Sequence, residues 1–275
     1  MPKNAALSPA LRNSFMNGLA LAPAGANVVM QLSRLPVGRG VAESRVDSGA
    51  LAKHPIKRTR TTLGYIVAVL LGDDEMREYI RREVNRQHRD VHSRDEDEVI
   101  YNAFDPDLQL WVAACMYQGS LDAIRLVAAD VSDELLDELY EHCSRFATTL
   151  QVPIERWPRD REAFEAYWRE ALGLIAMDNV TREYLRGMVR LRFLPRALNA
   201  WLGPIHEFIV TGFLPPLFRE QLGVSWSPGR QQGFDALCRA AVSVHRVLPR
   251  ALQEFPLNVV WWDTQRRHRA GRAFV

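Results

Sequence analysis

Apolar side chains recur with helical spacing along most of this chain. Residues 73–92 show the pattern most clearly, because apolar side chains fall at every fourth position from Met76 to Val84 and His88 takes the next place. Acidic residues open this segment, where they complement the positive end of a helix dipole. The pattern predicts a charged helix that turns one thin apolar stripe, with His88 on it, toward the core.

The rest of the pattern is also helical. Residues 58–72 are apolar on nearly all sides, which predicts a central helix that ends at Gly72. The next helix begins almost at once, so the two are expected to pack antiparallel, with the start of the first near His88. Further helices are predicted over residues 26–32, 105–116, 132–150, 158–174, 181–193, 198–213 and 234–247. Strand signals are scarce, and the predicted fold class is all-α, a single-domain helical bundle.

Composition and charge exclude several classes of protein. A chain of 275 residues with 47% hydrophobic content can bury a sizeable core, and a net charge of +2 argues against a dedicated nucleic-acid binder. The three cysteines are far apart and form no C-x-x-C, so neither a disulfide framework nor a zinc site is expected. A reducing cytoplasm is the expected compartment, because we find no signal-peptide pattern and no apolar run that spans a bilayer.

His88 is the residue on which a functional hypothesis depends. An imidazole on an apolar stripe needs a partner for its nitrogens, because a buried polar group left unpaired is costly. One interpretation is a core histidine bonded to a neighbouring carbonyl, and the other is an axial ligand to iron; the helix alone favours the first. The sequence has no C-x-x-C-H, so any haem would be held without thioether links.

Seven segments, taken in order, resemble the family of haem-b oxygenases that includes the rubber-cleaving latex clearing proteins and MpaB. They are MQLSRLPVGRGVAES, RTRTT with LLGDDE, VNRQHRDVH, YNAFDPDLQLWV, LQVPIERWP with FEAYW, GFLPPLFREQLGVSW and VLPRALQEFP. The resemblance implies a helical domain over residues 26–262, a bundle enclosing a haem or apolar ligand pocket, that holds haem b non-covalently between its helices. It leaves an N-terminal segment, residues 1–25, and a basic C-terminal tail, residues 263–275.

The resemblance also implies an iron ligand. The family's proximal histidine lies in a segment like HxxVxG, which residues 88–91 match, although Ser93 stands where glycine is usual. His88 is therefore the implied ligand, and a neutral imidazole nitrogen is a good donor to iron. His92, on the same predicted helix, is the alternative ligand.

On the distal side of the haem, the rubber-cleaving members carry an arginine, a lysine, a threonine and an upstream glutamate. Arg58 and Thr62 match the arginine and the threonine, and Glu43 matches the glutamate. Thr61 stands in place of the lysine and is the candidate cofactor-binding residue at that position. The absence of the lysine would leave the sixth iron position to water or oxygen. The resemblance implies that Glu43 removes an allylic proton as a general base. Arg58 and Thr62 would orient oxygen or stabilise charge on it. Alternatively, Arg58 binds a haem propionate and Thr62 caps a helix.

The implied function is oxygenation by haem b and O2, with attack on or cleavage of a carbon–carbon double bond in a hydrophobic, isoprenoid-type small molecule. The alternative is a non-catalytic helical protein of the same fold that binds haem or lipid. Thr61 favours this alternative, as does Ala113, which stands where many members have histidine. We expect a cytoplasmic protein without a nucleic-acid partner, and peripheral membrane contact stays open.

Overall fold

The structure is a computed structural model that describes residues 7–44, 54–128 and 130–274. Those residues form α-helices and short 3-10 helices without a strand, which confirms the predicted all-α, single-domain class. The elements are α1 Pro9–Phe15, η1 Gly18–Leu21, α2 Ala24–Leu32, α3 Leu35–Ala42, α4 Pro55–Leu71, α5 Asp74–His88, α6 Pro106–Val127, α7 Asp133–Thr148, η3 Ile154–Arg156, α8 Arg161–Leu172, α9 Asn179–Val189, α10 Arg196–Phe213, α11 Pro216–Leu222, α12 Pro228–Arg246, α13 Arg250–Gln253 and α14 Leu257–Arg269.

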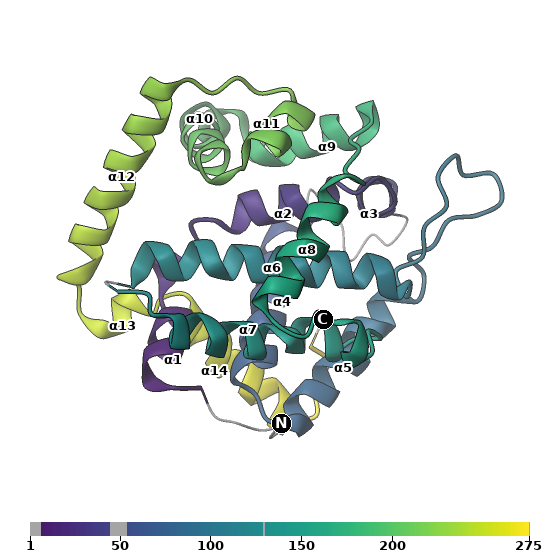
Figure 1. Cartoon of the computed structure of the whole chain (residues 1–275), viewed down its shortest axis with the longest axis horizontal. Helices are drawn as coiled ribbons and strands as arrows, with labels where there is room; N and C mark the ends of the chain where they lie inside the picture. Colours follow the sequence, from purple (N-terminus) through teal and green to yellow (C-terminus); the bar gives the residue numbers. More distant parts are fainter. Residues whose placement is uncertain (1–6, 45–53, 129, 275) are drawn as a thin grey trace.

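Helix α6 crosses the middle of the molecule, and much of the fold packs around it (Figure 1). Its start is specified locally, because the Asp105 side chain accepts hydrogen bonds from two backbone N–H groups of the first turn and Pro106 follows as the first helical residue. Helices α2 and α7 and the short η1 contact it, and Trp111 on α6 is fully buried. The indole N–H of Trp111 donates to the carbonyl of Gln31, which ties α6 to α2.

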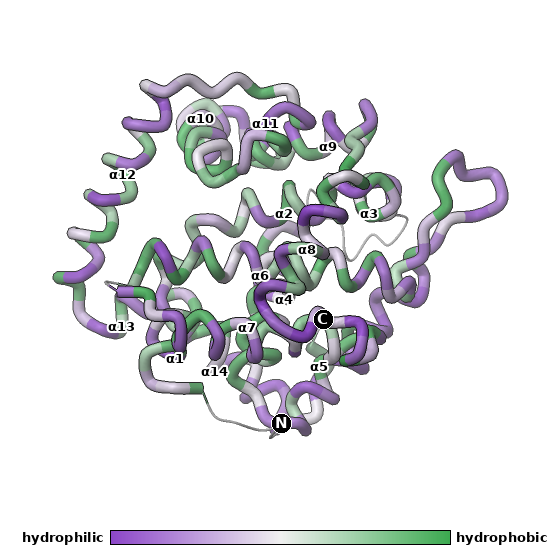
Figure 2. Tube along the Cα trace, viewed as in Figure 1, coloured by the Kyte–Doolittle hydropathy of each residue, from purple (hydrophilic) through white to green (hydrophobic). Residues whose placement is uncertain are grey.

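Helices α4 and α5 lie against each other after a short link. The Asp73 side chain caps α5 by accepting a hydrogen bond from the N–H of Met76 at 2.9 Å. Helix α5 ends at His88, four residues before the end that the sequence predicted. The chain turns there because it doubles back through an isolated antiparallel bridge between His92 and Asn102. Figure 2 shows that this loop, which projects from the body, is mostly hydrophilic.

Both ends of the described chain are part of the packed structure. Near the N-terminus, Leu11 on α1 is fully buried against α6 and α7. The boundary expected after residue 262 falls inside α14, which packs on α4, and Phe274 is only 3% exposed. Most of the arginine-rich tail that the sequence indicated therefore belongs to a docked helix, and the residues after Arg269 pack against α5. Residues 1–6 and 275 lie outside the described residues.

Within the described ranges, no helix combines the length and the apolar character needed to cross a bilayer. The cytoplasmic location and the peripheral membrane contact stay predictions.

Candidate functional site

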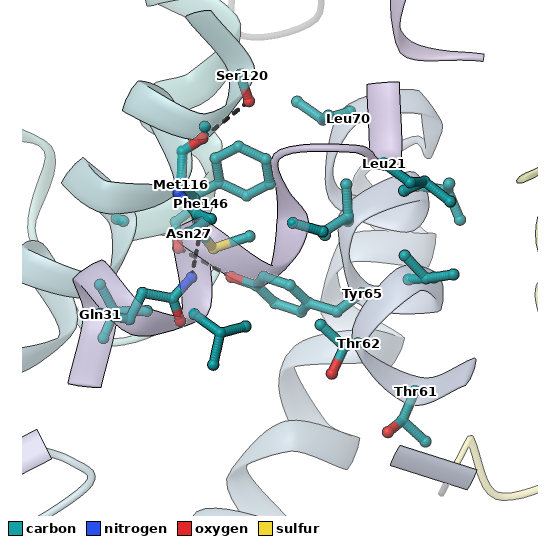
Figure 3. A pocket seen from close by; sticks show the side chains of 18 of the residues that line it. Leu21, Asn27, Gln31, Thr61, Thr62, Tyr65, Leu70, Met116, Ser120 and Phe146 are labelled. Carbon is teal, nitrogen blue, oxygen red and sulfur yellow. Dashed lines mark hydrogen bonds between the residues drawn. The ribbon is translucent and has the colours of Figure 1, made fainter. Parts of the chain in front are cut away.

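A cavity of about 290 Å³ lies among α2, α4, α5, α6 and α7. This volume is close to the lower end of the range of roughly 300–1,000 Å³ that is typical of small-molecule sites. Most of the residues that line it are apolar, and polar groups interrupt them at a few points. Figure 3 shows Thr61, Thr62 and Tyr65 of α4 in this lining, together with Asn27 of α2 and Met116 of α6. The cavity therefore suits a largely hydrophobic ligand that a few polar side chains orient.

His88 lines this cavity as the last residue of α5. Burial, and then the positive charge of Arg58, lowers its pKa to about 4, so the ring is neutral near pH 7. Its Nδ1 atom is buried and has no hydrogen-bond partner among the described residues. The ring of Phe104 stands edge-on to it, with the two ring centroids 6.4 Å apart. The interpretation of His88 as a core histidine held by a backbone carbonyl is therefore not supported at Nδ1.

Arg58 lies in the first turns of α4 and lines the same cavity. Arg58 is exposed, and partial desolvation by the surrounding protein nevertheless lowers the pKa of its guanidinium. No carboxylate among the described residues forms an ion pair with it. Because it lines the cavity and no carboxylate of the described residues engages it, this cation is suited to an anionic group on a bound ligand.

The two threonines differ in their surroundings. Thr61 is buried, and its hydroxyl donates to the carbonyl of Arg58 at 3.0 Å within the same helix. Thr62 lines the cavity well inside α4, so the interpretation of Thr62 as a helix cap is wrong. Arg58, Thr61, Thr62 and His88 thus come together around one cavity, as antiparallel packing of α4 and α5 requires.

Glu43 is not among the residues that line the cavity. It stands directly after α3, and its carboxylate accepts a charge-assisted hydrogen bond from Arg39. Arg39 also binds Asp178, the residue that caps α9, and donates to Glu98 of the projecting loop at 2.7 Å. These carboxylates, Asp178 foremost, raise the pKa of Arg39. Glu43 therefore belongs to an ion-pair cluster that joins α3, α9 and the loop.

The structure also places His92, the alternative iron ligand, and Ala113, which stands where many members of the resembled family have histidine. His92 is exposed in the loop after α5, where its Nδ1 lies 3.1 Å from the carbonyl oxygen of Ser93, and it does not line the cavity. Ala113 does line the cavity from α6, so a methyl group faces the space where many members carry an imidazole. Of the two candidate histidines, His88 alone lines the cavity.

Sequence reasoning missed the side chains that hold the end of α5. Gln151 donates to the side chain of Asn85, one turn before His88, at 2.7 Å. Gln151 also bonds to Gln109 of α6 through both its backbone N–H and its side chain. A glutamine on the inward side of a predicted helix was the available signal for Gln109. Gln151 lies 42 residues further along the chain, and no local pattern connects the two.

The described residues contain no group of three or more histidine, cysteine and acidic side chains that could hold a metal ion. A haem does not need such a group, because the porphyrin supplies four ligands and the protein supplies only an axial one. The residues that are present fit a haem: a neutral histidine, and an arginine without an ion-pair partner among the described residues, line one mainly apolar cavity. The fold and the site thus define an all-helical protein with a mainly apolar ligand cavity whose residues fit a haem.

The chain belongs to a known family of this class. Residues 12–243 match the family described as ER-bound oxygenase mpaB/B'/Rubber oxygenase, catalytic domain. This match confirms the resemblance drawn from the seven segments, and it means that the chain carries an oxygenase-family catalytic domain.

Two relatives are 43% identical to this chain over 250 residues, which is 91% of this chain and 98% of each relative. They are Uncharacterized protein Mb2261 of Mycobacterium bovis and Uncharacterized protein Rv2237 of Mycobacterium tuberculosis. No solved structure matches this chain. The functional inference therefore rests on the family and on the cavity.

Proposed function

We propose that this protein is a haem-b-dependent oxygenase that uses O2 to attack or cleave a carbon–carbon double bond in a hydrophobic small molecule. The observation that carries the proposal is the neutral ring of His88 on a mainly apolar cavity, with an Nδ1 atom that has no hydrogen-bond partner among the described residues. Iron requires an unprotonated imidazole nitrogen, and a pKa of about 4 keeps His88 in that form at every physiological pH. Membership of an oxygenase family supports the same reaction class.

In this proposal, His88 holds the iron through Nε2. Nδ1 is the nitrogen that is buried in the protein, which leaves Nε2 as the donor for a ligand in the cavity. Metal-bound histidines usually fix the ring by donating from the second nitrogen to an acceptor. His88 lacks such an acceptor at Nδ1 among the described residues, so the ring is held by packing against Phe104 and by the anchored end of α5.

Arg58 has a separate part in the proposal. Its desolvated guanidinium lacks an ion-pair partner in the described chain, and a haem propionate would supply the missing negative charge in a bidentate geometry. We therefore favour propionate binding over a direct role in orienting oxygen. Thr62 faces the cavity four residues further along α4 and supplies a hydroxyl that can donate to an oxygen atom of the substrates.

Haem b, when bound, supplies an iron that can change oxidation state for chemistry with O2. In a cleavage, the two atoms of O2 enter the two carbonyl groups of the products, so the reaction needs no external reductant. The mainly apolar lining of the cavity selects a hydrophobic substrate. Glu43 has no base role in this proposal because its carboxylate is engaged by Arg39 away from the cavity lining; it anchors α3 instead.

A second candidate is a non-catalytic protein that uses the same cavity to bind haem or lipid. Thr61, whose hydroxyl is engaged within its own helix, and Ala113, whose methyl group faces the cavity, favour it. This candidate predicts haem or lipid binding without consumption of O2. An assay with prenylated small molecules, in which aldehyde or ketone formation is measured, therefore separates the two candidates.

An absorption spectrum tests the proposed iron ligand. The purified protein, given excess haem, is expected to show a Soret band that His88→Ala abolishes. His92→Ala is the matched control, because its exposed ring lies off the cavity, and the band should be unchanged. A wild-type protein that takes up no haem, or a His88→Ala variant with an unaltered band, would contradict the proposal.

A further inference from the structure

The last described residues of the chain are fastened to the body of the protein by hydrogen bonds from several elements. The Tyr79 hydroxyl of α5 donates to the carbonyl of Arg272 at 2.7 Å. The N–H of Phe274 donates to the carboxylate of Glu83, also on α5, at 2.9 Å. Arginine side chains of α4 and α14 donate to the carbonyls of Phe274 and Ala273. Figure 1 places the C-terminus beside α5 accordingly.

Glu83 is the most deeply placed of these partners. It is 5% exposed, and it accepts a hydrogen bond from the Phe274 backbone while forming an ion pair with Arg86. A buried carboxylate needs such partners, because an unpaired one is strongly destabilised by desolvation. The backbone of residue 274 is therefore part of how this carboxylate is satisfied, which fixes the end of the chain at one position on α5.

The ring of Phe274 fills a slot that the sequence of α4 leaves open. A Cβ atom at Gly64 would lie 2.5 Å from the ring carbon Cζ of Phe274, so a larger residue at position 64 would collide with the ring. The ring also packs with Ala68 of α4 and stands edge-on to Tyr79 of α5, with their centroids 6.3 Å apart. Absence of a side chain at Gly64 is what lets the ring reach between the two helices.

Phe274 also lines the candidate cavity. Val84, which lies one turn before His88 on α5, packs against the same cluster as Phe274 and lines the cavity too. The ring therefore stands at the part of the cavity where α4 and α5 meet, on the side of the proposed iron ligand. A residue of the chain's end thus forms part of the wall of the site.

We propose that Phe274 is a specificity-determining residue, because its ring closes the cavity between α4 and α5 and limits the length of apolar ligand that lies beside His88. The inference rests on the proposed function, since it assigns the wall of the same site. Removal of the Phe274 ring would leave the slot against Gly64 and Ala68 open to the ligand.

Ligand length is the quantity that tests this inference. Primary alcohols from octanol to octadecanol compete with the dye anilinonaphthalene sulfonate for the purified, full-length protein. Each methylene that newly opened space buries contributes ~0.8 kcal/mol, which is about 4-fold in affinity. Phe274→Ala should therefore move the tightest-binding alcohol to a longer chain and tighten binding of the longest alcohols by roughly 10-fold. The shortest alcohols should bind as they do to the wild-type protein.

Phe255→Ala is the matched control, because its ring is 58% exposed and it does not line the cavity. Circular dichroism shows whether each variant keeps its helical fold. Should Phe274→Ala not fold, Phe274→Leu retains most of the packing and is expected to shift the preferred length in the same direction by less. Unchanged length preference in the folded variants, or an equal shift in Phe255→Ala, would overturn the inference.

Haem titration of the same samples separates this inference from the proposed function. A Soret band that depends on His88, together with an unchanged length preference, would remove only the role of Phe274. A shifted length preference without haem uptake would remove the oxygenase proposal and leave Phe274 as a wall of the cavity.

Discussion

Two arginines of this protein lie in opposite electrostatic surroundings. Arg39 is 9% exposed and binds the carboxylates of Glu43, Glu98 and Asp178, which come from three different parts of the chain. Arg58 lines the cavity beside His88 and forms an ion pair with no described residue, and its desolvation lowers its pKa. The first cation is fully satisfied by the fold, whereas the second one is not.

The difference separates a structural charge from a functional one. A satisfied ion-pair cluster joins α3, α9 and the projecting loop and leaves no capacity for a ligand. A cation that lines a ligand cavity and has no ion-pair partner among the described residues is available to an anionic group of a ligand, so its position indicates binding. The family resemblance marked both Glu43 and Arg58 as functional, and this comparison supports a site role for Arg58 only.

The largest expected effect follows from making the same substitution at both arginines. Arg39→Met leaves Asp178 and Glu43 without their cation, so the free energy of unfolding should fall by about 2–4 kcal/mol, below the ~3–5 kcal/mol of a fully buried pair because these carboxylates are partly exposed. Arg58→Met removes an uncompensated charge and should change it by less than ~1 kcal/mol, or raise it. Urea denaturation measures both.

Equal losses of stability in the two variants would mean that Arg58 has an unrecognised structural partner. Arg39→Lys serves as a control for charge, because lysine keeps the positive charge but cannot contact several carboxylates in the geometry of a guanidinium. An intermediate loss is expected for it.

The next largest effect is on haem affinity, which should fall in the Arg58 variant and stay unchanged in the Arg39 variant. If Arg58 binds a propionate, Arg58→Met should weaken haem binding by roughly 10–100-fold, which corresponds to the ~1.5–3 kcal/mol of a hydrogen bond to a charged group. The pKa of His88 should rise at the same time, because the Arg58 charge contributes to lowering it. Haem titration followed by the Soret band, and NMR titration of His88, measure these two results.

Arg39→Met is the matched control for this affinity measurement. Its haem affinity should equal that of the wild-type protein under conditions in which it is folded, since Arg39 does not line the cavity. Loss of haem binding in Arg39→Met, or its full retention in Arg58→Met, would remove the distinction between the two arginines.

Sequence patterns predicted the surroundings of Arg58 better than those of Arg39. Helical periodicity placed His88 on an inward stripe, and the short link at Gly72 predicted that the start of α4 would approach it. Both are local properties of consecutive residues. The carboxylates that bind Arg39 lie 59 and 139 residues away at Glu98 and Asp178, where only tertiary structure brings them together. The i to i+4 spacing of Arg39 and Glu43 was the one local signal available.

The C-terminal region was misjudged for a different physical reason. Its arginines dominate the composition and suggested a basic tail outside the helical domain, but the buried Leu257 and Thr264 lie seven residues apart on one face of α14. Helical spacing of these few inward residues decides whether the segment docks, and the charged residues need only stay on the outer face. Phe274 follows after the helix, where periodicity makes no prediction.

The smallest effect is the pH dependence of stability, and it tests whether the ring beside Arg58 is as desolvated as the structure indicates. The pKa of His88 falls from 6.5, its ordinary value, to about 4 in the folded protein. Between these values the unfolded chain binds a proton that the folded protein does not, so stability is retained above pH 6.5 and lost as the pH falls toward 4. We expect a loss of about 1–2 kcal/mol from His88, less than the full shift implies because water can enter the cavity.

His88→Gln should remove this part of the pH dependence. His142, whose pKa is also lowered to about 4 by burial, adds a second loss over the same range, so the wild-type protein and each single variant must be compared. His142→Gln is the matched control, because it leaves the contribution of His88 in place. Urea denaturation at pH values from 7 to 4 measures the difference, and parallel loss of stability in the wild-type protein and His88→Gln would show that His88 titrates as an exposed ring. An exposed ring at position 88 would be ill suited to hold iron beside Arg58. The assignment of Arg58 and His88 to a functional site would then fail.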